Sequence, residues 1–134
     1  MILVDTTVLI DFFKGSQNNK VLLFKDVIKQ SLPFGISEYT YLEVLQGARD
    51  QTEYDYLNEY LLDMNIYFLP KTVEIYEKAV KIYFHLKRQG VTPRSTIDIL
   101  IALTTIEYGL SLLHNDKDFD VMGAFMPTFT IYND

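Results

Sequence analysis

Short apolar segments alternate with amphipathic helical stretches along this chain, and this alternation restricts its fold more than any other feature. The sequence predicts strands over residues 2–5, 33–37, 66–69, 110–113 and 129–132. It predicts helices over 8–14, 20–31, 39–49, 51–64, 72–89 and 97–108, and a helical turn over 116–121. Strands that alternate with helices favour an α/β fold. We therefore expect a parallel sheet of about four to five strands, flanked by helices in a three-layer, Rossmann-like arrangement.

Composition bounds the class of protein. We expect a single domain over residues 1–134, because a chain of this length with 49% hydrophobic residues can bury one sizeable core. The apolar runs are too short to span a membrane, and the N-terminus lacks the basic region of a signal peptide. The chain has no cysteine, which excludes disulfides, thiolate metal sites and a cysteine nucleophile. That composition suits a reducing cytoplasm.

Four carboxylates occupy special positions relative to these predicted elements: Asp5, Glu43, Asp98 and Asp116. Asp5 and Asp116 come just past predicted strand ends, and parallel sheets bind ligands at that edge. Asp98 lies in the first turn of a predicted helix, where free N–H groups stabilise a carboxylate. Glu43 is set among apolar residues beside a buried stripe. Taken singly, Asp5 or Asp116 could serve only as a helix cap, but the joint pattern predicts one site.

The chemistry of such a site follows from its donor atoms. Carboxylates in apolar settings are costly unless they are paired or bind metal. Oxygen ligands collected from distant parts of a chain are those that Mg²⁺ and Mn²⁺ prefer. Divalent ions lower the pKa of an attacking water and stabilise a leaving oxygen. Neither histidine has an obvious partner for nucleophilic catalysis. The sequence therefore predicts a metal-dependent enzyme that cleaves phosphodiester bonds.

The charge distribution bears on the substrate. The net charge of −6 counts against a nucleic-acid partner, although cations at the acidic site would neutralise part of it. Residues 71–94 hold six basic residues and only two acidic ones. This stretch is either a solvated helix face or a surface that positions phosphates. The candidate phosphate contacts are Lys81, Lys87, Arg88 and Arg94.

Four motifs in order carry a family resemblance: Asp5-Thr6-Thr7-Val8-Leu9-Ile10; Leu42-Glu43-Val44-Leu45-Gln46-Gly47; Ile97-Asp98-Ile99-Leu100-Ile101-Ala102; and Leu112-Leu113-His114-Asn115-Asp116-Lys117-Asp118-Phe119. The chain resembles a PIN domain over nearly its whole length, and within that superfamily it is similar to the VapC-type toxins of toxin–antitoxin pairs. The resemblance implies a ribonuclease that uses Mg²⁺ or Mn²⁺, is inhibited by a small antitoxin protein and forms a homodimer.

The resemblance also assigns roles to residues. It implies that Asp5, Glu43, Asp98 and Asp116 form the catalytic metal site. Thr6 matches a hydroxyl beside the first acid, and Asp118 matches an additional acid. Arg94, which precedes the Asp98 helix, is the basic residue that we expect nearest the substrate. The chain departs from the family pattern at Thr7, where asparagine or serine is usual, and at His114, where threonine or serine is usual.

Two other functions compete with a ribonuclease. A PIN-like scaffold could bind RNA or a partner without cutting, but loss of an acid would mark it, and all four acids are present. A phosphatase with an aspartyl nucleophile would need a second aspartate at position 7, where this chain has threonine. For the antitoxin, we expect a docking surface on the helical segments 21–28 and 54–62, which carry more apolar residues than one buried stripe needs.

Overall fold

A parallel five-stranded sheet forms the middle layer of the protein, whose computed structural model describes residues 1–133. The strands are β1 (Ile2–Val4), β2 (Phe34–Ser37), β3 (Asn65–Tyr67), β4 (Ser111–Leu113) and β5 (Thr130–Ile131). Their spatial order is β3-β2-β1-β4-β5, and every neighbouring pair is parallel. The predicted α/β class with a parallel sheet is therefore confirmed.

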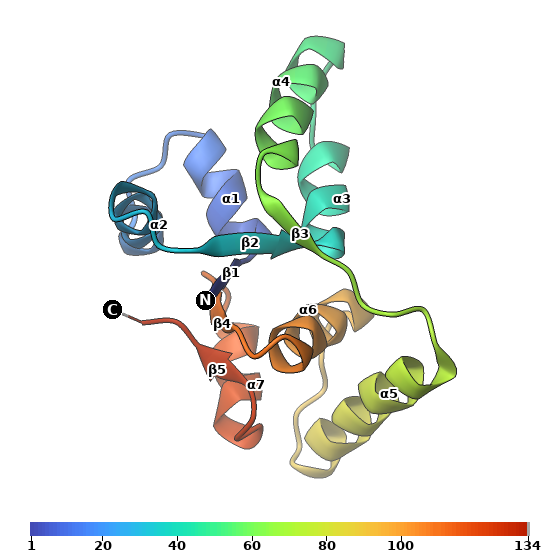
Figure 1. Cartoon of the computed structure of the whole chain (residues 1–134). Helices are drawn as coiled ribbons and strands as arrows, with labels where there is room; N and C mark the ends of the chain where they lie inside the picture. The colour runs from blue at the N-terminus through green and yellow to red at the C-terminus, as the bar shows by residue number, and fades with distance from the viewer. Residues whose placement is uncertain (134) are drawn as a thin grey trace.

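Helices cover both faces of this sheet (Figure 1). The helices α1 (Thr6–Phe13), α2 (Asn19–Lys29), α3 (Glu38–Gln46) and α4 (Gln51–Leu62) pack on one face. The helices α5 (Val73–Arg88), α6 (Thr96–Glu107) and α7 (Lys117–Phe125) pack on the other. Side chains alternate across β1 accordingly, because Ile2 and Val4 join the first core and Leu3 joins the second. The sheet thus separates two hydrophobic cores.

The predicted boundaries shift where side chains hydrogen-bond to the backbone. Helix α1 begins at Thr6 rather than residue 8, because the Asp5 carboxylate caps it by accepting the Thr7 N–H. Strand β3 ends at Tyr67 rather than residue 69, because the Leu69 N–H donates to Glu38 Oε2 at 2.8 Å instead of to the sheet. Helix α7 continues to Phe125, well past the predicted turn, and buries Phe119 and Met122 on one side.

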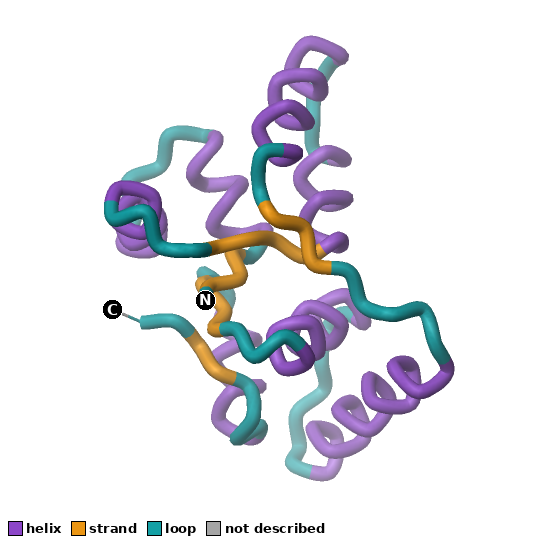
Figure 2. Tube along the Cα trace, viewed as in Figure 1, coloured by secondary structure: helices purple, strands orange, loops and turns teal. Residues whose placement is uncertain are grey.

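The order of the strands determines where a site can form. The chain builds β1, β2 and β3 outward in one direction and then returns through α5 and α6 to place β4 on the other side of β1. Figure 2 shows the two long loops of this return, one before α5 and one between α5 and α6. Helices α1 and α7 therefore leave the adjacent strands β1 and β4 toward opposite faces of the sheet. Such a switch point opens a crevice at the carboxyl ends of the strands.

Gly35 permits the close approach of β2 and β3. A Cβ atom at this position would lie 2.6 Å from the Asn65 carbonyl oxygen and 2.6 Å from the Tyr67 ring. We predict that Gly35→Ala lowers the free energy of unfolding by about 1–3 kcal/mol, because the strand pairing has to shift to accept the methyl group. Urea denaturation followed by circular dichroism measures this. The matched control is Gly47→Ala, where the nearest atom would lie 3.5 Å away. Equal stability of the two variants would contradict the steric argument.

Candidate active site

A hollow of about 290 Å³ lies at this switch point, and the acids predicted from the sequence surround it. It is lined by Asp5, Thr6, Thr7, Glu43, Arg94, Ser95, Asp98 and Asp116. These residues come from the start of α1, from α3, from the start of α6 with the loop before it, and from the loop after β4. Segments that are far apart in the sequence thus supply one concave, strongly acidic surface.

Asp5 is a buried residue of the hollow, and both its carboxylate and its backbone N–H form hydrogen bonds. Its Oδ2 accepts the Thr7 hydroxyl at 2.7 Å and the Thr7 N–H at 3.1 Å. The Thr7 hydroxyl oxygen in turn accepts the Asn115 N–H at 3.0 Å, and the Asp5 N–H donates to the Leu113 carbonyl at 2.9 Å. Thr7, the mild departure from the family pattern, therefore ties the loop after β4 to the carboxylate that follows β1.

Glu43 reaches the hollow from α3 through hydroxyl groups. The Thr6 hydroxyl donates to Glu43 Oε1 at 2.7 Å and lies 3.1 Å from the hydroxyl of Thr40. Thr40 is anchored in turn, because its N–H donates to the Ser37 hydroxyl that caps α3. This chain of small polar groups holds Glu43 toward the first acid. The sequence did not draw attention to Thr40, although its place three residues after a capping serine is a recognisable signal.

Three further carboxylates lie close to one another at the N-termini of α6 and α7. Asp98 lies in the first turn of α6, Asp116 caps α7, and Asp118 lies in the first turn of α7. One carboxylate oxygen from each lies within 4.8 Å of the other two, a spacing at which a single cation could contact all three. Asp116 Oδ1 also accepts the Asp118 N–H at 2.9 Å. Two helix N-termini thus point at this group and favour negative charge there.

Burial and mutual repulsion raise the pKa of two of these acids. The pKa of Asp5 rises to about 6, chiefly because the carboxyl is buried; Glu43 adds to the rise, and the hydrogen bonds from Thr7 oppose it. The pKa of Asp98 also rises to about 6, first through burial and then through its neighbours Asp5 and Asp116. Repulsion alone would predict a raised pKa at such a cluster, but burial is the larger cause at both positions.

Arg94 lies over the acidic cluster. Its Nε donates to Asp118 Oδ2, and its Nη2 lies 3.3 Å and 3.5 Å from the two carboxylate oxygens of Asp116. Its side chain is nevertheless 72% exposed, so solvent reaches the guanidinium while it contacts these acids. We expected Arg94 to lie near the substrate; in this structure it is engaged by the chain's own acids.

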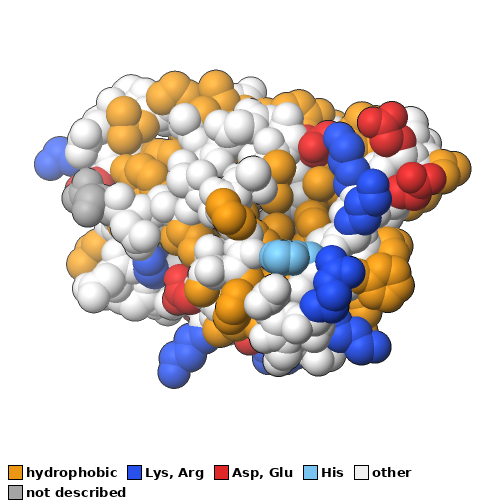
Figure 3. Space-filling view, turned by 90° about the horizontal axis from the view of Figure 1, so that it is seen from below, with side chains coloured by type: hydrophobic (Ala, Val, Ile, Leu, Met, Phe, Trp, Pro, Cys, Tyr) orange, Lys and Arg blue, Asp and Glu red, His pale blue; other side chains and the backbone are white. Residues whose placement is uncertain are grey.

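The other basic candidates lie apart from the hollow. Lys81, Lys87 and Arg88 are exposed on α5, and none of them lines the acidic hollow. Figure 3 shows Lys and Arg side chains gathered in a row along one side of the face that it views. Within residues 1–133, no ion pair involves these three side chains, so they remain available to an anionic partner.

His114, the second departure from the family pattern, is buried behind the hollow rather than in it. Its Nδ1 accepts the Asp116 N–H at 3.1 Å, and its Nε2 lies 3.4 Å from Asp120 Oδ1. Burial lowers the pKa of the imidazole, although Asp120 opposes this effect. The ring supports the turn that presents Asp116 by accepting the Asp116 N–H at its unprotonated Nδ1. The sequence did not reveal this role.

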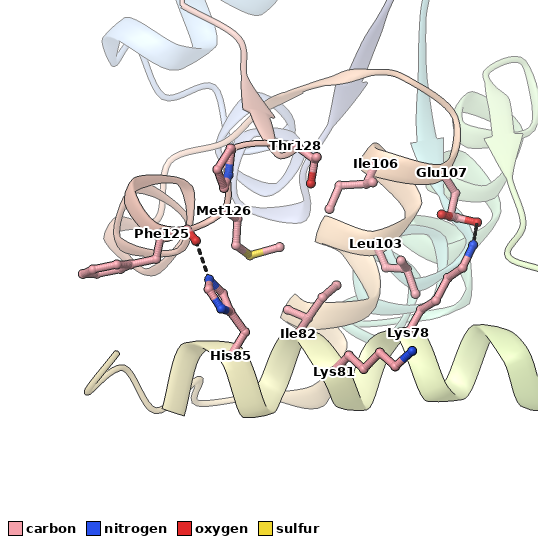
Figure 4. A pocket seen from close by; sticks show the side chains of 11 residues that line it. Lys78, Lys81, Ile82, His85, Leu103, Ile106, Glu107, Phe125, Met126 and Thr128 are labelled. Atoms are coloured by element: carbon pink, nitrogen blue, oxygen red, sulfur yellow. Dashed lines mark hydrogen bonds and ion pairs between the residues drawn. The ribbon is translucent and has the colours of Figure 1, made fainter. Parts of the chain in front are cut away.

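A second hollow, of about 330 Å³, lies between α5, α6 and the end of α7 (Figure 4). Apolar side chains such as Ile82, Leu103 and Met126 form much of its wall. Two of its polar side chains have partners within the wall: Lys78 pairs with Glu107 at 2.9 Å, and His85 Nε2 lies 2.7 Å from the Phe125 carbonyl oxygen. This second hollow is largely apolar, whereas the first is lined by carboxylates, so the acidic hollow is the candidate active site.

The fold and the acidic hollow together define the class of protein. The PIN domain family model matches residues 2–124, so this chain belongs to the PIN domain family. The chain is 27% identical over 123 residues to "Ribonuclease VapC11" of Mycobacterium tuberculosis, and the match covers 91% of each protein.

Solved structures agree with this assignment. A structure of VapBC-1 from nontypeable Haemophilus influenzae superposes with a TM-score of 0.67 at 26% identity, covering 94% of this chain and 96% of that one. A toxin–antitoxin complex from Klebsiella pneumoniae superposes with a TM-score of 0.69 at 25% identity, covering 98% of this chain and all of that one. The resemblance to a PIN domain of the VapC type is thus confirmed.

The raised pKa of Asp98 makes the stability of the metal-free protein depend on pH. The folded pKa is about 6 and the ordinary value is 3.8, so the folded state retains a proton through this window that the unfolded state releases. Stability therefore falls as the pH rises from about 4 to about 6. We predict that Asp98→Asn has little effect at pH 4 but stabilises the metal-free fold by about 1–2 kcal/mol at pH 7.5, after allowance for partial exposure.

Urea unfolding of both proteins in EDTA at the two pH values measures this difference. Asp26→Asn, a change of an exposed acid on α2, controls for the loss of one negative charge. A stability difference between wild type and Asp98→Asn that is the same at both pH values would show that ionisation of Asp98 carries no cost in the fold.

Proposed function

We propose that this PIN-domain protein is a metal-dependent ribonuclease that hydrolyses RNA phosphodiester bonds at the acidic hollow and acts as the toxin of a toxin–antitoxin pair. One observation carries the proposal: five carboxylates from four separate segments surround or border one hollow at the switch point of the sheet. Membership of the PIN domain family and the similarity to a protein named as a ribonuclease support the same reaction.

The donor set fits a hard divalent cation. Carboxylate oxygens are the preferred ligands of Mg²⁺ and Mn²⁺, and Asp98, Asp116 and Asp118 already bring oxygens within 4.8 Å of one another. Two carboxyls with raised pKa values gain most from a cation that neutralises them. Asp5, Glu43, Asp98 and Asp116 are the proposed catalytic acids and metal ligands, with Mg²⁺ or Mn²⁺ as the ion. When bound, such an ion activates water and stabilises the leaving oxygen.

The remaining residues of the hollow support these acids. Thr6 holds Glu43 and Thr7 holds Asp5, so both carboxylates keep their orientation without rearrangement during the reaction. Asp118 adds negative charge beside Asp116 and accepts a hydrogen bond from Arg94 Nε. Lys81, Lys87 and Arg88 offer a basic approach along α5 for the phosphates of the RNA.

The competing functions fit the structure less well. A phosphatase would need an aspartate at position 7 as the acid beside its nucleophile, but Thr7 instead donates a hydrogen bond to Asp5. A scaffold that binds without cutting would have no need to keep the costly Asp5 carboxyl buried among other acids. The ribonuclease reading accounts for both observations.

We predict that Asp5→Asn and Asp98→Asn each reduce RNA cleavage at least about 100-fold, since each removes a charged oxygen from the proposed ion. Cleavage of a generic RNA is followed on gels with Mg²⁺, with Mn²⁺ and with EDTA. Divalent ions should also raise the melting temperature of the wild type but not that of the variants, because they bind the folded state alone. Asp26→Asn is the control that should behave as wild type. Cleavage that persists in EDTA would refute a metal-dependent reaction.

A separate apolar surface fits the antitoxin. Phe13 of α1 forms edge contacts with Tyr56 and Tyr60 of α4, and Phe12 forms a tilted contact with Tyr60. The Tyr56 side chain is 59% exposed. A hollow of about 650 Å³ between α1, α3 and α4 opens beside this aromatic group. Leu22 and Ile28 of α2 and Leu62 at the end of α4 are also exposed. These helices contain the segments 21–28 and 54–62 that the sequence indicated, and patches of this kind mark interfaces.

We predict that Tyr56→Glu abolishes co-purification with an antitoxin expressed from the adjoining small reading frame, because it places a charge within the apolar surface. Nuclease activity of the isolated protein should be unchanged, because Tyr56 lies outside the acidic hollow. Tagged co-expression measures the association, and Val121→Glu, at an exposed apolar position on α7, is the control. Co-purification of Tyr56→Glu at the wild-type level would place the antitoxin elsewhere.

A homodimer in the cytoplasm completes the proposal. The exposed stripe of Val73, Tyr76, Val80 and Phe84 along α5 lies apart from the proposed antitoxin surface and supports a second copy as its partner. Among residues 1–133, no helix has both the length and the apolar composition to cross a bilayer. A single PIN domain over residues 1–134 is likewise proposed.

A further inference from the structure

Arg94 contacts two of the three aspartates that could hold a metal ion. Its Nε donates to Asp118 Oδ2, and its Nη2 lies within 3.5 Å of both oxygens of Asp116. The same two aspartates, with Asp98, are those whose oxygens lie within 4.8 Å of one another. A guanidinium and a divalent ion cannot both approach the same carboxylate oxygens closely, because their charges repel and their positions overlap.

The excess of negative charge in the hollow explains why the Arg94 guanidinium is held beside the acids. The hollow and its border hold five carboxylates, and within residues 1–133 Arg94 is the only basic side chain that lines it. Arginine suits this position better than lysine, because its planar fork lets Nε contact Asp118 while Nη2 contacts Asp116. In the metal-free protein, Arg94 therefore offsets part of the repulsion among these acids.

The local backbone allows the side chain to leave without a change of fold. Arg94 lies in the loop between α5 and α6, preceded by Pro93 and followed by Ser95, whose hydroxyl caps α6 by accepting the Ile97 N–H at 3.0 Å. The backbone is thus held on both sides, while the side chain is 72% exposed. Rotation about its own bonds takes the guanidinium from the acids to the mouth of the hollow.

From these contacts we propose that Arg94 is a built-in counter-cation that competes with the divalent metal for Asp116 and Asp118, and thereby sets the metal affinity of the site. When the ion binds, Arg94 is displaced toward the mouth of the hollow and becomes a positioning residue for the incoming phosphate. This inference rests on one part of the proposed function, namely that a divalent ion binds the acids of the hollow.

Titration of the metal-free protein with Mn²⁺ tests this directly, with free Mn²⁺ measured by electron paramagnetic resonance and without RNA. Arg94→Ala and Arg94→Gln should bind Mn²⁺ at least about fivefold more tightly than the wild type, since a competing positive charge is gone. The Mn²⁺ affinity of Arg94→Lys should lie between those of the wild type and Arg94→Ala, because lysine keeps the positive charge but lacks the planar guanidinium that contacts two aspartates at once. In EDTA, Arg94→Ala should also melt at a lower temperature than the wild type.

Arg88→Ala is the matched control, because it removes the same charge at the end of α5 from a side chain without a partner among the acids. Its Mn²⁺ affinity should stay within about twofold of the wild type. Unchanged or weaker Mn²⁺ binding by Arg94→Ala would overturn the proposal and show that Arg94 only orients its neighbours, while leaving the ribonuclease proposal intact. If the wild type bound no Mn²⁺, both the metal site and the competition would fail.

Discussion

The burial of the Asp5 carboxylate is the constraint on which the site depends. This group lies directly after β1, is 2% exposed and has a pKa of about 6, so keeping it ionised at neutral pH costs free energy. The fold limits that cost with the hydroxyl and N–H of Thr7 and with the N-terminus of α1. What remains of the cost makes a cation favourable in the hollow. A buried charge that is only partly compensated is thus a source of metal affinity.

The acids serve the fold and the site together. Asp5 caps α1 and Asp116 caps α7, and both line the acidic hollow. Helix capping and metal binding are therefore not alternatives at these positions, because a capping carboxylate uses one oxygen for the backbone N–H and can offer the other to a cation. Asp98 lies in the first turn of α6 but does not cap it. Removing its charge therefore tests the effect of that charge without also removing a helix cap, as a substitution of Asp5 or Asp116 would.

Three regions of the surface differ in their chemistry. The acidic hollow lies at the carboxyl ends of β1 and β4, the aromatic surface lies on α1 and α4, and exposed basic residues lie on α5. The proposed function requires surfaces of different chemistry, because RNA is anionic and a protein inhibitor would cover apolar groups. Arg94 belongs to the acidic hollow, where it contacts Asp116 and Asp118.

The sequence by itself determined the class of fold and the identity of the acids. Periodicity placed the strands and helices, since apolar side chains must face a core, and the motifs around Asp5, Glu43, Asp98 and Asp116 marked the residues that belong together. Only the tertiary structure decided how they meet. The order β3-β2-β1-β4-β5 sets β4 beside β1, and the hydroxyl of Thr6 brings Glu43 to the hollow. Arg94 is engaged by Asp116 and Asp118, and His114 is turned inward behind them. Such pairings join residues far apart in the chain, so local pattern carries no record of them, whereas burial and hydrogen bonding in the folded state select them.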